Sequence, residues 1–320
     1  MFIGFNDTCS HVITAGDSGF QMYALSPNLR RVTNDTSLGP LSIAAVEESS
    51  KTLCAVLRNS GTNMANRTLI LAEMPGGKII SEMFFEDPIL RLRVNSMRLV
   101  VVMERRIHVL DWKSLAPAPQ ISTTSPPNKT GIAALSSCPP FGGPCWLAWP
   151  STDHAGSRGD AVVMDLITGK VNMIEAHKSP LAALEFCYGG SRLATCSTKG
   201  TIIRVYANPT GLLLYQLRRG AKDALIDSLV FSSSGRYLAA VSNTATLHVF
   251  LCDGSLPADN EIRSFAKISV KEDRKNVVGV LEGDDLVFVA SKPLTGNEAT
   301  LEQYSVAKGD CKRVGEFALR

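Results

Sequence analysis

An internal repeat is the feature that most restricts how this chain can fold. Two consecutive segments align without gaps over their first two strands, and four of their residues recur 45 positions apart. The aligned pairs are Leu184 with Leu229, Phe186 with Phe231, Leu193 with Leu238, and Ser197 with Ser242. A period of this length, built from short strands and turns, is typical of one four-stranded β-propeller blade. Because 320 residues hold about seven such units, the repeat predicts an all-β, seven-bladed propeller of four-stranded antiparallel blades.

The remainder of the chain also has the pattern of short strands. Apolar runs of three to six residues, rich in Val, Ile and Leu, alternate with turns of Gly, Asn, Asp and Ser. A closed all-β fold accommodates this length as one domain, so we expect a single WD-repeat-type propeller over residues 1–320, although neither repeat unit contains the Trp-Asp dipeptide. The strands expected outside the repeat are Phe2–Phe5, Val12–Ala15, Gly19–Ala24, Leu29–Val32, Thr52–Leu57, Thr68–Leu71, Lys78–Met83, Leu99–Met103, Arg106–Leu110, Trp146–Ala148 and Ala161–Asp165.

Composition excludes several classes of function. A net charge of +3 is too small for broad nucleic-acid binding, so any anion site has to be local. No apolar run reaches the roughly 18 residues that span a bilayer, and the N-terminal residues lack the pattern of a signal peptide. The eight cysteines are scattered, which predicts buried reduced thiols in a cytoplasmic protein and no metal site. No catalytic motif is present, so we expect a binding protein without cofactor, not an enzyme.

Adjacent arginines, Arg218 and Arg219, lie at the end of an apolar strand that we expect to be the outermost of its blade, and they are the clearest candidate for binding chemistry. Successive side chains of a strand point to opposite faces, so each arginine would serve a different site. A guanidinium is a permanent cation that binds phosphate through two parallel hydrogen bonds. The flanking repeat units supply hydroxyl, guanidinium and imidazole donors, at Ser197, Thr201, Arg204, Ser242, Thr246 and His248. Since Arg204 and His248 are 44 apart, one extra residue is expected, as a bulge near Ile202.

Each of these residues also has a simpler interpretation. A pair of arginines on an outermost strand commonly keeps that edge from pairing with another chain. Ser197, Thr201, Ser242 and Thr246 can cap turns through bonds to the backbone. His248 can be a histidine that bonds within its own blade. The combined pattern on both sides of one strand nevertheless favours two phosphate sites.

The run Leu217-Arg218-Arg219-Gly220 resembles the Phe/Leu-Arg-Arg-Gly signature of the PROPPIN family. The resemblance is dense over residues 176–250 and extends to Gly4-Phe5-Asn6-Asp7 and Gly19–Tyr23. It implies a seven-bladed propeller that binds phosphatidylinositol 3-phosphate and phosphatidylinositol 3,5-bisphosphate, with no preference between them decided by the motif. It also implies a role in autophagy and endosomal traffic, with a monomer recruited from the cytoplasm to preautophagosomal or endosomal membranes. The alternative is a WD-repeat scaffold that binds proteins and no lipid.

The resemblance assigns residues to two lipid sites. The first would use His177, Ser197, Thr201, Arg204 and Arg218. The second would use Arg219, Gly220, Ser242, Thr246 and His248, with Gly220 allowing close approach of the backbone. Ligands of this charge would favour protonated histidines, so binding is expected to tighten at mildly acidic pH. Asn6 and Asp7 in the first blade resemble the motif through which the family contacts an autophagy lipid-transfer protein, on the side that also carries the polar loop Arg58–Arg67 of the second blade. The alternative is that Asn6 and Asp7 are ordinary polar turn residues.

Members of the family typically carry a long loop in the sixth blade that inserts apolar side chains into the bilayer. The corresponding stretch here, Cys252–Ile262, is short, carries three carboxylates, and offers only Leu256 and Ile262 as large apolar groups. We expect the outermost strand of the blade to begin near Arg263–Ala266. Acidic residues are repelled by an anionic bilayer, so the sequence predicts that this protein relies on the two headgroup sites more than its relatives do, and that its binding is unusually sensitive to salt.

Overall fold

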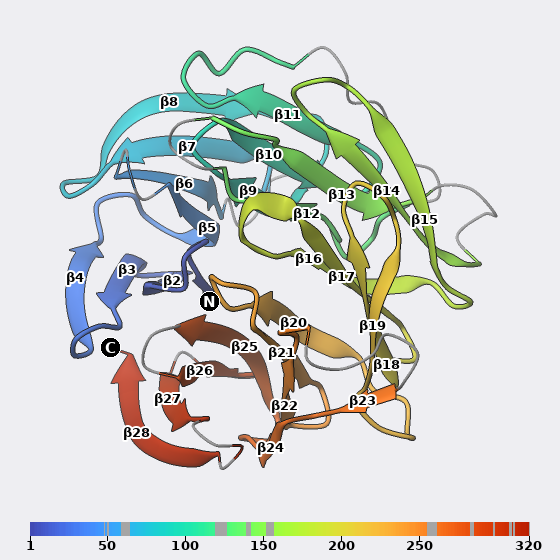
Figure 1. The fold of residues 1–320 in the computed structure, drawn as a ribbon. Coiled ribbons are helices and arrows are strands. Elements are labelled where there is room, and N and C mark those ends of the chain that lie inside the picture. Colours follow the sequence, from blue (N-terminus) through green and yellow to red (C-terminus); the bar gives the residue numbers. More distant parts are fainter. Residues whose placement is uncertain are drawn as a thin grey trace. The chain divides into compact units, whose positions relative to one another are not determined.

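The computed structural model describes most of the chain as short antiparallel strands (Figure 1). The residues it describes are 1–47, 49, 51–58, 65–118, 127–138, 142–151, 157–254, 261–281, 285–296, 298–306, 309 and 311–319. Among these residues, a single helical turn is described at Tyr188–Gly190, between two strands. No helix within the described part of the chain is long and apolar enough to cross a membrane. The chain divides into two compact units, Met1–Gly131 and Ile132–Arg320.

The first unit contains three sheets in chain order. Its first two sheets have four strands each, and the third has three, in the order β11-β10-β9. Beyond β11, an isolated bridge joins Leu110 to Pro117, and the backbone N–H of Ala118 donates to the Val109 carbonyl at 2.8 Å. The strands are β1 Phe2–Phe5, β2 His11–Gly16, β3 Gly19–Ala24, β4 Arg30–Asp35, β5 Leu41–Glu47, β6 Thr52–Leu57, β7 Thr68–Glu73, β8 Lys78–Phe84, β9 Ile89–Val94, β10 Arg98–Met103 and β11 Ile107–Asp111.

The second unit contains the other four sheets and the whole of the repeat. Three of these sheets have four strands, and the fifth sheet of the chain has five, in the order β16-β17-β18-β19-β23. Its strands are β12 Ala134–Leu135, β13 Trp146–Pro150, β14 Gly159–Asp165, β15 Val171–His177, β16 Leu181–Phe186, β17 Arg192–Ser197, β18 Ile202–Ala207, β19 Leu213–Arg218, β20 Ile226–Phe231, β21 Tyr237–Ser242, β22 Thr246–Leu251, β23 Glu261–Arg263, β24 Ala266–Ser269, β25 Arg274–Leu281, β26 Leu286–Pro293, β27 Ala299–Ser305 and β28 Lys312–Leu319.

The first strands of successive sheets lie against one another within each unit. In the first unit β1 contacts β5 and β5 contacts β9, and in the second unit β12, β16, β20 and β25 form an equivalent series. The seven sheets, three in the first unit and four in the second, are the blades of a seven-bladed β-propeller, the fold class that the 45-residue period predicts.

The two repeat units superpose in register as well as in length. The strands β16 and β20 begin 45 residues apart, as do β17 and β21, and both first strands carry a register shift at the equivalent place. The expected bulge near Ile202 is absent, since β17 and β18 pair without a shift. The extra residue lies in the turn instead: four residues separate β17 from β18 and three separate β21 from β22.

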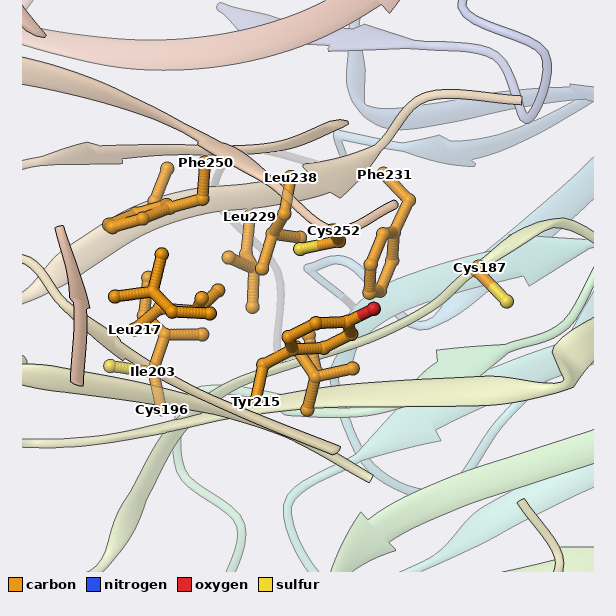
Figure 2. Packing of buried hydrophobic residues seen from close by; sticks show 14 of the residues in the cluster. Cys187, Cys196, Ile203, Tyr215, Leu217, Leu229, Phe231, Leu238, Phe250 and Cys252 are labelled. Atoms are coloured by element: carbon orange, nitrogen blue, oxygen red, sulfur yellow. The ribbon is translucent and has the colours of Figure 1, made fainter. Parts of the chain in front are cut away.

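Apolar side chains of the fifth and sixth sheets form one continuous core (Figure 2). Leu217 of β19 and Phe250 of β22 are fully buried and point into this core from its two sides. Seven of the eight cysteines are buried, as the sequence predicts, and burial raises the pKa of the Cys196 and Cys252 thiols to about 12. Buried thiols with raised pKa values are inert packing groups. The described residues contain no group of His, Cys, Asp and Glu side chains that could hold a metal ion.

Candidate anion-binding site

The two adjacent arginines lie at the end of β19 in different surroundings. Arg218 is the last residue of the strand, and the backbone N–H of Arg219 continues the ladder by donating to the Thr201 carbonyl at 2.9 Å. Leu217 points into the core between the fifth and sixth sheets, so strand alternation places Arg218 on the opposite face. The guanidinium of Arg219 donates to the carbonyl oxygens of Gly200, at 2.6 Å, and Lys222. The guanidinium of Arg218 bonds the Glu261 carboxylate instead, so within the described part of the chain the two guanidinium groups share no hydrogen-bond partner.

Arg204 links the first group of predicted site residues. Its guanidinium donates to the carbonyl of Ala176 and contacts Nδ1 of His177, both at 3.0 Å, while its Nε donates to Gln216 at 3.2 Å. The other ring nitrogen of His177 lies 2.9 Å from the Thr195 hydroxyl. Burial, reinforced by the positive charge of Arg204, lowers the pKa of His177 to about 4. This histidine is therefore neutral at physiological pH.

The turn between β17 and β18 positions the second arginine. Gly200 has a φ of +61°, and a Cβ at this position would lie 1.8 Å from the carbonyl oxygen of Ala224, so only glycine fits. Its own carbonyl is the one that Arg219 contacts. Ser197, at the end of β17, is 6% exposed, and Thr201 is half-buried next to β18. The turn thus joins residues of the first predicted site to the arginine of the second.

The second group centres on the turn between β21 and β22. Ser242 is fully buried and its hydroxyl lies 2.9 Å from that of Thr244, while the Thr246 hydroxyl donates to the Thr244 carbonyl at 3.1 Å. His248 is 2% exposed, stacks on Phe250, and has its Nδ1 3.3 Å from the Ser264 hydroxyl. Burial, followed by the charges of Lys267 and Arg219, lowers the pKa of His248 to about 4.

The structure brings some predicted residues together and leaves others apart. Arg204 and His177 form one hydrogen-bonded chain that reaches Arg218 through Gln216 and Glu261. Ser242 and Thr246 bond within their own turn, as turn-capping residues do. A Cβ placed on Gly220 would meet nothing within 4 Å, so no crowding in this structure requires glycine there.

Several polar residues at the site were not predicted from the sequence. Thr195 and Gln216 complete the bonds of His177 and Arg204, and they could have been found from the two-residue alternation of β17 and β19. Glu261 and Ser264 come from the connection between β22 and β24. No local signal in the sequence indicated that this connection returns to the fifth sheet.

The N-terminal residues form a compact turn in the first unit. Asn6 is 8% exposed, and its side chain bonds the hydroxyls of Thr8 and Ser10 and the backbone N–H of His11 at 2.8 to 3.0 Å. Asp7 is exposed beside it. Arg58 pairs with Asp17 at 2.7 Å, whereas residues 59–64 of the predicted polar loop lie outside the described residues.

Comparison with known proteins identifies the family. The PROPPIN family model matches residues 1–264 of this chain. The chain belongs to the PROPPIN family. It is 34% identical over 254 residues to mouse "WD repeat domain phosphoinositide-interacting protein 2". This match covers 78% of this chain and 54% of the relative. It is 30% identical over 325 residues to "Autophagy-related protein 18" of Aspergillus clavatus, covering 91% of this chain and 74% of the relative.

Solved structures of other proteins have the same fold. Hsv2 of Kluyveromyces lactis, in a structure with complete loop 6CD, matches with a TM-score of 0.80 at 17% identity and covers 98% of this PROPPIN and 97% of that chain. KlAtg21, solved in complex with the coiled coil of AgAtg16, matches with a TM-score of 0.81 at 20% identity, covering 100% and 99%. This chain spans about half the length of its mouse relative.

Proposed function

We propose that this PROPPIN is a phosphoinositide-binding effector with two headgroup sites, one on each side of β19. The first site is Arg218 with Arg204, His177, Ser197 and Thr201, and the second is Arg219 with Gly220, Ser242, Thr246 and His248. Its ligands would be phosphatidylinositol 3-phosphate and phosphatidylinositol 3,5-bisphosphate. The protein would act in autophagy and endosomal traffic, as a monomeric single propeller recruited from the cytoplasm to preautophagosomal or endosomal membranes.

The separation of the two guanidinium groups is the observation that carries this proposal. Arg218 and Arg219 are adjacent in sequence, yet among the described residues Arg218 bonds the Glu261 carboxylate and Arg219 bonds the carbonyl oxygens of Gly200 and Lys222. Both are half-buried, so each guanidinium is held in place and still reachable. A fixed, always charged planar group is the side chain best suited to a phosphate monoester. Relatives whose names include phosphoinositide interaction and autophagy support the same assignment.

A vesicle flotation series tests the proposal. Vesicles that differ only in the presence of phosphatidylinositol 3-phosphate are mixed with the protein at physiological salt, and a third set carries the 3,5-bisphosphate. We expect retention on both phosphorylated sets and none on the plain vesicles. A protein that stays unbound on all three sets would instead be a WD-repeat scaffold that contacts acidic proteins.

We also propose a protein partner on the N-terminal surface, of the lipid-transfer class that acts in autophagy. Asp7 is exposed on a turn that Asn6 holds through its side-chain bonds, so the carboxylate is presented without contributing to the core. The Asp7→Lys variant should lose copurification of such a partner while keeping its fold. Undiminished copurification would rule this surface out.

A further inference from the structure

The connection between the third and fourth strands of the sixth sheet pairs with the neighbouring sheet. The strand β23, Glu261–Arg263, lies in this connection but forms a parallel ladder with β19 of the fifth sheet (Figure 1). Gln216 pairs with Glu261, Leu217 with Ile262, and Arg218 with Arg263. The strand β19, which carries the candidate lipid motif, therefore lies between β18 and β23. The expectation from the sequence that it is the outermost strand of its blade is wrong. The fourth strand of the sixth sheet, β24, begins only at Ala266.

The segment Glu261–Ser264 contacts one predicted residue of each headgroup site. The Glu261 carboxylate accepts two hydrogen bonds from the Arg218 guanidinium, one from Nη2 to Oε1 at 2.7 Å and one from Nε to Oε2. It also accepts a hydrogen bond from the Gln216 side chain at 3.3 Å. The Ser264 hydroxyl lies 3.3 Å from Nδ1 of His248. The two-pronged contact of the carboxylate is the geometry that Arg218 would use for a phosphate.

An apolar anchor holds this segment in place. Ile262, at the centre of β23, is 6% exposed and belongs to the core that contains Leu217 and Phe250. The side chain that the sequence offered as an apolar group for bilayer insertion is thus buried inside the protein. Its neighbour Glu261 remains 37% exposed at the side chain, beside an Arg218 side chain that is 34% exposed.

We propose that the segment Glu261–Ser264 is an internal competitor of the lipid headgroup, which holds Arg218 and His248 until a phosphate displaces it. The inference rests on the proposed function of the two sites and adds their regulation. Because phosphate and Glu261 use the same two nitrogens of Arg218, they cannot both be bound in this geometry. The measured affinity is then the intrinsic affinity of the first site multiplied by the fraction of molecules in which the segment is displaced.

Removing the competing charge should therefore strengthen lipid binding. In the Glu261→Gln variant the amide retains its size and β23 retains its anchor, but the ion pair with Arg218 is lost. Exposed ion pairs are weak, so the apparent affinity for vesicles with phosphatidylinositol 3-phosphate should rise only roughly two- to fivefold. The matched control is Glu272→Gln, which removes one negative charge from an exposed turn between β24 and β25.

Vesicle binding by the wild type, Glu261→Gln and Glu272→Gln distinguishes failure of the competitor from failure of the lipid function. A gain in Glu261→Gln that Glu272→Gln lacks supports the competitor. Equal binding by the wild type and Glu261→Gln overturns it and leaves the lipid function intact, as does an equal gain in both variants, which reports net charge alone. Absence of binding by all three proteins overturns the proposed function and the inference with it.

Amide hydrogen exchange supplies a second, independent measurement. The peptide covering Glu261–Ser264 should exchange faster when the wild-type protein is saturated with vesicles containing phosphatidylinositol 3-phosphate than with plain vesicles. Exchange that is unchanged by lipid in a sample shown to be bound would mean that β23 stays paired, which overturns displacement.

Discussion

At the residue scale, burial determines how the predicted site residues can act. His177 and His248 are almost completely enclosed and have pKa values near 4, whereas Arg218 and Arg219 are half-exposed and always charged. All four side chains bond the protein in this state, but the arginines are partly exposed, so a ligand can reach them once Arg218 exchanges Glu261 for it. His177 positions Arg204 and Thr195, and His248 contacts Ser264.

This difference alters the expected pH dependence of binding. With pKa values of about 4, both histidines are neutral from about pH 5.5 to about pH 7.5, and the lowered pKa of Glu261 keeps it ionised throughout. A phosphate monoester loses its second proton near pH 6, so its attraction to the arginines grows as pH rises. Flotation over this range should be flat or increase with pH. A decline with rising pH would show that the histidines become protonated against the ligand, as the sequence alone suggested.

At the element scale, the turns that end β17 and β21 determine the geometry of the site. The turn at residues 198–201 contains one more residue than its counterpart, and Gly200 allows it to pass close to Ala224. Its carbonyl at Gly200 then receives Arg219, so the turn aligns the arginine of one site while its flanks carry residues of the other.

A substitution at Gly200 tests the role of this turn. In Gly200→Ala the new Cβ would overlap the Ala224 carbonyl and the residue would be held at a positive φ, which destabilises by roughly 1–3 kcal/mol. We expect a lower melting temperature together with weaker lipid retention. Gly254→Ala, at an exposed turn where a Cβ meets nothing within 4 Å, is the control for strain at positive φ alone. Equal melting temperatures for the two variants would contradict the close approach.

The sequence predicted most of the elements and only part of the site. Periodic apolar residues such as Leu184 and Leu229 report burial directly, so the repeat yields strand order and blade number. The pairing of β23 with β19 depends on contacts between residues more than 40 positions apart, such as Arg218 with Glu261, which no local pattern records. The burial of His248 likewise depends on how β24 and Ser264 pack against β22.

At the scale of the whole molecule, charge is the property that decides how the protein would hold a membrane. The net charge is only +3, and the apolar group Ile262 is buried in the core, while Leu256 lies outside the described residues. Attraction to the bilayer would then come chiefly from the local cations at the two sites, and this attraction acts over distances that salt shortens.

Binding should accordingly be sensitive to ionic strength. Raising salt from about 0.1 M to about 0.5 M shortens the screening length well below its value of roughly 10 Å, so most of the protein should leave vesicles that contain phosphatidylinositol 3-phosphate. Retention at high salt that disappears in a Leu256→Ser variant, with the buried Ile262 left unchanged, would show instead that the connection inserts into the bilayer.

The measurement that tests the two-site account most directly is flotation of the arginine variants. Arg218→Thr, Arg219→Thr and the double variant are compared with the wild type on vesicles with phosphatidylinositol 3-phosphate, with circular dichroism and melting temperature as controls of folding. Each single variant should keep one site and lose avidity, which can amount to about 10² when two sites engage one surface. The double variant should remain folded and unbound. A folded double variant that floats as well as the wild type would contradict the account.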